Sequence, residues 1–204
     1  MFYDILDKKR IDFLPNLAVF KDRFYLARGT GLALQIGHRD SIDFDFFIQR
    51  DFDTTVLYNE IFDLFKGRTI IKTLDEKNSL NVVIDEEIKL SFLKYPYPLL
   101  NPLIHEDYLN IASIEDIGCM KFSALVGRAV EKDYVDLYFI LQNISLQTLL
   151  LNTAEKMPDL DHNLILKSLV YFEDVAREKI MFKHDFKISL PEIQEFLECQ
   201  VKIL

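Results

Sequence analysis

Cysteines are few in this sequence, long apolar runs and low-complexity tracts are absent, and each of these features excludes a class of protein. The two cysteines, Cys119 and Cys199, are far apart and form no CxxC pair. This disfavours a disulfide scaffold and a zinc ribbon, and we expect both thiols to be buried and reduced.

No apolar run approaches the roughly 20 residues that a membrane helix needs. Charges interrupt the N-terminal MFYDILDKKRIDF before a secretory signal could form. We therefore predict a cytoplasmic protein without a membrane span.

Basic residues are also in the minority. The 204 residues carry 24 Lys and Arg against 33 Asp and Glu, a net charge of −9. A general nucleic-acid coat protein is thereby disfavoured, although a local basic patch is compatible with the composition. Half of the residues are apolar, which is enough for a sizeable buried core and excludes a disordered chain.

The first 108 residues mix strand and helix patterns. Strands are predicted at 24–27, 41–48, 68–74, 80–85 and 88–95, and helices at 30–37 and 53–66. We expect Thr30 to cap the first of these helices and Gly67 to end the second. The last three strands are separated by short polar breaks, which predicts a meander of hairpins.

The second half has helical periodicity. Helices are predicted at 114–129, 133–141, 146–157 and 163–179, and a last one begins at Pro191. Ser113 is the expected N-cap of the first. We therefore predict an α+β protein with an α/β domain over 1–108 and a helical domain over 109–204.

Two short motifs in the first half suggest chemistry. Gly29-Thr30 lies where a strand passes into a helix, and the next strand carries Asp43 and Asp45 on one face. A glycine lets a phosphate approach the backbone, and a helix N-terminus favours an anion. Paired carboxylates can hold a divalent cation such as Mg²⁺. The order G-[ST] followed by D-x-D resembles nucleotidyltransferases of the polymerase-beta type.

Three longer blocks resemble the AbiEii/AbiGii-type toxin family. FYLARGTGLALQIGHRDSIDFDFF (24–47) is similar to the family's "GGTALAL…GHR.S.DIDFF". IKLSFLKYPYP (88–98) is similar to its hydrophobic strand followed by YP. MKFSALVGRAVEKDYVDLYFIL (120–141) is similar to "K…AL..R…KD..DLY.LL". The blocks span 24–141 in the expected order, and the resemblance implies a nucleotidyltransferase-like mixed-sheet domain with a helical C-terminal domain.

The resemblance also implies a function. Such proteins are toxin components of type IV toxin–antitoxin systems that use Mg²⁺ and a nucleoside triphosphate, and some transfer nucleotides to tRNA. A cognate antitoxin and a tRNA acceptor are therefore the implied partners. The acceptor, the preferred base and the oligomeric state do not follow from the sequence.

The residues implied as catalytic are Asp43, Asp45, Lys121 and Asp136. Asp43 and Asp45 would bind the metal, and Lys121 would pair with a phosphate. Asp136, or alternatively Asp133, would orient Lys121 or act as a base on the acceptor hydroxyl.

Four further residues are implied as nucleotide-binding: Gly29, Thr30, Arg39 and Ser41. Gly29 and Thr30 would hold triphosphate oxygens. His38 and Arg39 either line the site or form a surface turn.

Two positions depart from the family pattern. Arg28 stands where the family has glycine, and it could add a phosphate contact or block one. Ser91 stands where many members carry a third acidic residue, and a hydroxyl is a poor substitute for a carboxylate at a two-metal site. Asp85, Glu86 and Glu87 lie near in sequence, but we expect them in the turn before that strand.

Structural interpretations remain beside the functional ones. Asp43 and Asp45 could form the solvated face of an edge strand, and Lys121 could lie on a helix surface. Arg128 and Asp133 could pair across a helix junction, and Asp136 could pair with Lys132 one turn away.

Two alternative functions also remain. One is a catalytically lapsed module that binds a nucleotide or a partner. The other is a nucleotidyltransferase acting on a small molecule.

Overall fold

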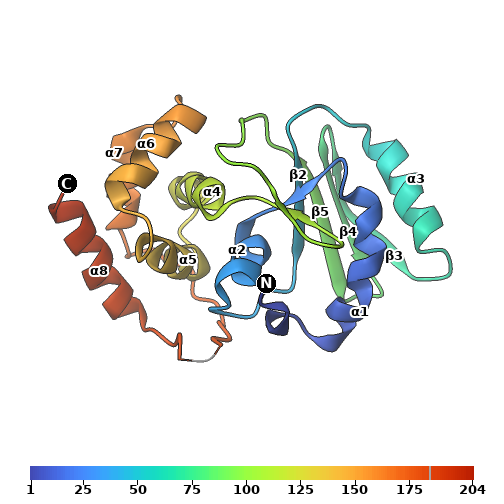
Figure 1. Ribbon diagram of the computed structural model, residues 1–204, viewed down its shortest axis with the longest axis horizontal. Helices are drawn as coiled ribbons and strands as arrows, with labels where there is room; N and C mark the ends of the chain where they lie inside the picture. The colour runs from blue at the N-terminus through green and yellow to red at the C-terminus, as the bar shows by residue number, and fades with distance from the viewer. Residues whose placement is uncertain (184) are drawn as a thin grey trace.

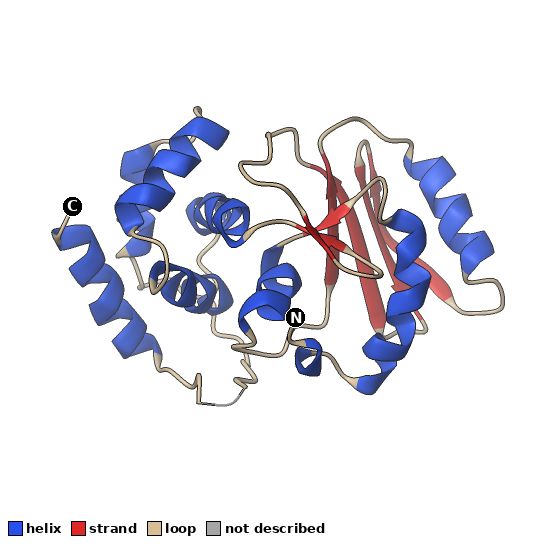
Figure 2. Ribbon diagram, in the orientation of Figure 1, coloured by secondary structure: helices blue, strands red, loops and turns tan. Residues whose placement is uncertain are grey.

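A mixed seven-stranded sheet and a helical half make up the protein in the computed structural model, which describes residues 1–183 and 185–204. Helices α1 (Lys8–Leu17) and α3 (Thr54–Leu64) lie on one face of the sheet (Figure 1). Helix α2 (Arg28–Ile36) lies on the other face, between the sheet and the helical half. Figure 2 shows the strands gathered at one side of the molecule and helices alone at the other. The predicted α+β fold is confirmed.

The strands are β1 (Tyr25–Leu26), β2 (Phe44–Ile48), β3 (Ile70–Glu76), β4 (Ser79–Ile84), β5 (Ile88–Lys94), β6 (Ile104–His105) and β7 (Asn110–Ile111). Their order is β3-β4-β5-β2-β1-β7-β6. The hairpin meander β3-β4-β5 is antiparallel, as expected, whereas β5 joins β2 in parallel. Asp85 and Glu86 form the turn between β4 and β5, both with positive φ, so they lie away from Ser91 as predicted. In the β2–β5 register Ser91 is the direct neighbour of Asp45.

The helical half comprises α4 (Ile114–Gly127), α5 (Glu131–Leu141), α6 (Leu146–Lys156), α7 (His162–Leu169) and α8 (Leu190–Lys202). The hydroxyl of Ser113 caps α4 by accepting from the N–H of Asp116, as predicted. Pro191 lies in the first turn of α8. The apolar cluster of this half also includes Tyr25, Leu32 and Phe47 from the first half. The core is thus continuous across residue 108, and the division into two domains stays a prediction. No helix in the described part of the chain combines the length and hydropathy needed to cross a membrane.

The predicted helix over 163–179 is wrong in its second half. Helix α7 ends at Leu169, where the hydroxyl of buried Tyr134 donates to the carbonyls of Ser168 and Tyr171. The chain beyond it, 170–183, which we call the return segment, runs back toward the first half. Its Ala176 bridges to Val130 and its Phe182 bridges to Arg39. These tertiary contacts override the local helical periodicity.

Three local predictions also need correction. Helix α2 begins at Arg28 with Ala27 as N-cap, so Thr30 lies inside the first turn and does not cap it. Helix α3 ends at Leu64, and Gly67 lies in the turn that follows with φ of 91°. Cys119 is buried, but Cys199 is exposed, because it lies on the outer face of α8.

Candidate functional site

A cleft of about 440 Å³ opens between the sheet and the helical half. Its walls come from the β1–α2 turn, the loop 39–43, β5, α4, the start of α5 and the return segment. The predicted residues Gly29, Thr30, Arg39, Ser41, Asp43, Asp45 and Lys121 all line it. The cleft also includes residues that sequence reasoning did not single out, notably Lys89 and residues 178–181 of the return segment.

The β1–α2 turn has a backbone conformation that side chains rarely adopt. Arg28 has φ of 55°, in the left-handed region where glycine is favoured. A non-glycine residue held there costs on the order of 1–3 kcal/mol, and such strain often marks functional sites. The glycine that the resemblance led us to expect at position 28 therefore has a physical reason, and this chain retains arginine against it.

Gly29 is required by a close approach. A Cβ built on Gly29 would lie 2.6 Å from Nη2 of Arg39 and 3.3 Å from Oγ of Ser41. The Arg39 side chain cannot move aside freely, because its guanidinium donates twice to Asp136. The absence of a side chain at Gly29 thus makes room for Arg39 and Ser41 beside the start of α2, whose first N–H groups have no partner within the helix.

Thr30 and Ser41 fix the loop that carries the first aspartate. Thr30 is buried, its hydroxyl donates to the carbonyl of Asp43, and it shares a 2.8 Å hydrogen bond with the hydroxyl of Ser41. Both hydroxyls are thus occupied within the protein. Their role as triphosphate ligands stays a prediction, whereas their position holds Asp43 at the cleft.

The two aspartates lie at the start of β2. Asp43 immediately precedes the strand and Asp45 is its second residue. The side chain of Asp43 is 47% exposed and lies 3.8 Å from Nζ of Lys89. The side chain of Asp45 is 17% exposed and lies 3.6 Å from the guanidinium of Arg28. Neither aspartate is on an edge strand, because β2 lies between β1 and β5.

The donor set fits one magnesium ion brought by a nucleotide. Among residues 1–183 and 185–204 no three His, Cys, Asp or Glu side chains come together as a metal site. The neighbour of Asp45 on β5 is Ser91, which supplies no charge. Mg²⁺ is, however, commonly held by one or two carboxylates with substrate phosphates and water. Asp43 and Asp45 suit that arrangement, and a closed all-protein metal cage is not formed.

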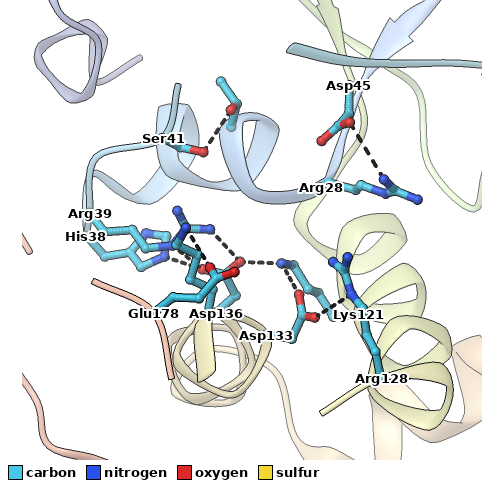
Figure 3. Close-up of polar contacts among 12 residues, drawn as sticks. Arg28, His38, Arg39, Ser41, Asp45, Lys121, Arg128, Asp133, Asp136 and Glu178 are labelled. Carbon is cyan, nitrogen blue, oxygen red and sulfur yellow. Dashed lines mark hydrogen bonds and ion pairs between the residues drawn. The ribbon is translucent and has the colours of Figure 1, made fainter. Parts of the chain in front are cut away.

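A buried ionic network lies beneath the cleft, centred on Asp136 of α5 (Figure 3). Asp136 is fully buried and accepts hydrogen bonds from Arg39 at 2.8 Å and from Nε2 of His38 at 2.8 Å. It also pairs with Lys121 of α4. Asp136 does not line the cleft, and neither does His38. Its geometry therefore favours an orienting role toward Lys121 and Arg39 over contact with a substrate.

Asp133 and Lys132, at the start of α5, form ion pairs around the same network. Asp133 pairs with Lys121 at 2.8 Å and with Arg128 at 3.3 Å, so the predicted pairing across the helix junction is present. The side chain of Lys121 is 6% exposed, which excludes the surface interpretation. Lys132 pairs with Glu178 of the return segment, not with Asp136 as the structural alternative supposed.

Burial and charge act in opposite directions on the titration of this network. Burial alone would raise the pKa of Asp136, but Arg39 and Lys121 hold it well below its usual range. Burial lowers the pKa of His38 below its ordinary value of 6.5, and this outweighs the hydrogen bond to Asp136. Asp136 is therefore ionised and His38 neutral at pH 7.

We expect a pH-dependent stability that depends on His38. Because its pKa is lowered in the folded state, its contribution is full above pH 6.5 and is lost as the pH falls below that value. The free energy of unfolding should decline toward pH 5 with a contribution of up to about 1.4 kcal/mol per pH unit. The contribution of Asp136 is lost only at lower pH, through its depressed pKa. Denaturant unfolding at several pH values measures the slope.

The control for this prediction is the exposed His105. His38→Gln should flatten the decline between pH 7 and 5, whereas His105→Gln should leave it as in the wild type. An unchanged slope in His38→Gln would refute the assignment.

The sequence matches the family of nucleotidyl transferase AbiEii toxins of type IV toxin–antitoxin systems over residues 12–198. An uncharacterized protein of Aquifex aeolicus (strain VF5) is 37% identical over 201 residues, which cover 96% of this chain and 94% of that protein.

Solved structures share the fold. MenT4, a nucleotidyltransferase toxin from Mycobacterium tuberculosis H37Rv, superposes with a TM-score of 0.63 at 17% identity, covering 96% of this chain and 82% of that one. JHP933 from Helicobacter pylori gives a TM-score of 0.55 at 17% identity, covering 96% and 89%.

Proposed function

Because the chain belongs to the family of AbiEii nucleotidyl transferase toxins of type IV toxin–antitoxin systems, we propose that it transfers a nucleotide from a nucleoside triphosphate to an acceptor hydroxyl on RNA. The reaction is in-line attack of that hydroxyl on the α-phosphorus, with pyrophosphate leaving. The observation that carries the proposal is the cleft in which Asp43, Asp45, Gly29 and Lys121 lie together.

The charge of the cleft supports an anionic substrate. Seven cationic and five acidic side chains line it, although the whole chain has a net charge of −9. The cationic ones are Arg28, Arg39, Lys89, Lys121, Arg128, Lys132 and Lys179. An excess of positive charge in a cleft of an acidic protein attracts an anion to that cleft. An RNA end and a triphosphate both meet this requirement.

Each residue has a role in this proposal. Asp43 and Asp45 would hold the magnesium ion that accompanies the nucleotide. The start of α2 lines the cleft at Arg28, Gly29 and Thr30, where its unpaired N–H groups can bind phosphate oxygens. Lys121, anchored by Asp133 and Asp136, offers a fixed positive charge from the helical half. Magnesium, when bound, neutralises charge on the triphosphate.

The partners follow from the family and are proposals for this chain. An antitoxin is expected, because the family is defined by type IV toxin–antitoxin systems. A tRNA is the proposed acceptor, and the cytoplasm is the proposed location.

The test uses the intact chain with labelled nucleoside triphosphates, Mg²⁺ and total tRNA. We expect label on RNA, and removal of the metal with EDTA should abolish it. A parallel incubation with an aminoglycoside tests the small-molecule alternative. Label on the small molecule alone would reject an RNA acceptor.

The lapsed-module alternative is favoured by one observation, the neutral Ser91 beside Asp45. It predicts nucleotide binding by calorimetry with no label on either acceptor, and that result would reject the proposed transfer.

A further inference from the structure

Both aspartates of the cleft have a cationic neighbour from the protein itself. Asp45 lies 3.6 Å from Arg28, and Asp43 lies 3.8 Å from Lys89. At these distances the oppositely charged groups form ion pairs but are too far apart for a hydrogen bond. The carboxylates that would bind a cation are therefore charge-compensated before one arrives.

Arg28 is held at this place by several features. Its backbone keeps the left-handed conformation of the β1–α2 turn. Its guanidinium lies 5.1 Å from the ring centre of Phe47, the second residue after Asp45 on the same strand face. In the view of Figure 3 the side chain extends from the start of α2 toward Asp45, on the side of Lys121 and Arg128. The side chain is 41% exposed, so it can leave Asp45 without opening the core.

Lys89 reaches the same cleft from β5. It lies two residues before Ser91, so it projects from the same face of the sheet. Its side chain is 45% exposed and lines the cleft with Arg28. The strand that lacks a third carboxylate at Ser91 thus contributes a positive charge instead.

Resting on the function proposed above, we propose that Arg28 is a triphosphate-binding residue that Asp45 holds until nucleotide and metal arrive together. A divalent ion alone meets two carboxylates already paired with cations, and its charge repels both of those cations. The negative charge of a triphosphate draws Arg28 away from Asp45 and Lys89 away from Asp43. Both carboxylates are then free to bind the ion. Metal and nucleotide therefore bind with strong positive coupling, and this coupling is reciprocal.

The variant Arg28→Gln distinguishes the effect of Arg28 on metal binding from its effect on nucleotide binding. In the absence of nucleotide, Mn²⁺ binding followed by electron paramagnetic resonance should become about fivefold tighter, because a repelling charge is removed. In the presence of Mg²⁺, ATP binding by calorimetry should become about tenfold weaker, because a charge-assisted phosphate contact is lost. Arg28→Lys keeps the charge and should fall between Arg28→Gln and the wild type in both assays. If Arg28 only supported the fold, its replacement would weaken both Mn²⁺ binding and ATP binding.

Arg68 offers a matched control. It also pairs loosely with an aspartate, Asp85 at 3.3 Å, and lies over the ring of Phe13 at 5.6 Å, but it is outside the cleft. Arg68→Gln should change neither affinity. If Arg28→Gln changed the Mn²⁺ and ATP affinities in the same direction, or changed neither, the inference would be overturned. The proposed nucleotide transfer would not be affected by that result. Absence of triphosphate binding in the wild type would overturn both, so the two failures are distinguishable.

Discussion

Asp45→Ala and Asp43→Ala should each abolish nucleotide transfer while the protein remains folded. Among the described residues that line the cleft, these two are the acidic side chains at the start of β2. Because no third acidic residue of residues 1–183 and 185–204 joins them as a metal ligand, the loss of one leaves a single acidic ligand for the ion. We expect the rate of label incorporation to fall at least about a hundredfold.

Asp51 supplies the control at the other end of β2. It is an exposed aspartate that pairs with Lys94 at 2.5 Å, and it lies outside the cleft. Asp51→Ala should transfer label at the wild-type rate. Circular dichroism should show all three variants folded, since both cleft aspartates are partly exposed and their removal leaves no fully buried charge. Wild-type transfer by Asp43→Ala and Asp45→Ala would refute the metal-binding assignment.

The second large effect is expected on stability, from Asp136→Asn. The substitution leaves the buried cations Arg39 and Lys121 without their shared carboxylate. Breaking a buried ion pair by removing one partner typically costs about 3–5 kcal/mol. Denaturant unfolding should show a loss of that order, and Mg²⁺–ATP affinity should also fall at a temperature where the variant is folded, because both cations line the cleft.

A second buried pair separates these two consequences. Asp116 and Lys156 are both fully buried, pair at 2.6 Å, and lie outside the cleft. Asp116→Asn should lose stability of the same order, while its nucleotide affinity stays at the wild-type value in the folded protein. Equal nucleotide affinity in Asp136→Asn and Asp116→Asn would exclude an orienting role for Asp136.

The sequence predicted much of the fold because its signals are local. The hairpins of β3, β4 and β5 follow from period-two alternation and short polar breaks, and the cap at Ser113 follows from its side-chain chemistry. The family pattern assigned Ser91 to the position of a third acidic residue, and the register of β2 and β5 makes it the direct neighbour of Asp45.

Other features depend on long-range contacts that no local pattern encodes. The cleft-lining position of Lys89 could have been found, because it shares a strand face with Ser91. The return segment could not, since its conformation is set by Val130 and Arg39, many residues earlier in the chain. The burial of Asp136 likewise results from α2, α4 and α5 coming together, and the sequence alone left its pairing partner open.

The position of the return segment has a consequence for the order in which the cleft is assembled as the chain is synthesised. Residues 178–181 form one wall of the cleft, and the segment is anchored by backbone hydrogen bonds between Met181 and Asp40 and between Lys183 and His38. A ribosome that has translated only the first 170 codons carries a chain without that wall. The cleft is therefore complete only after residues 178–181 have been translated, long after the strand that carries Asp45.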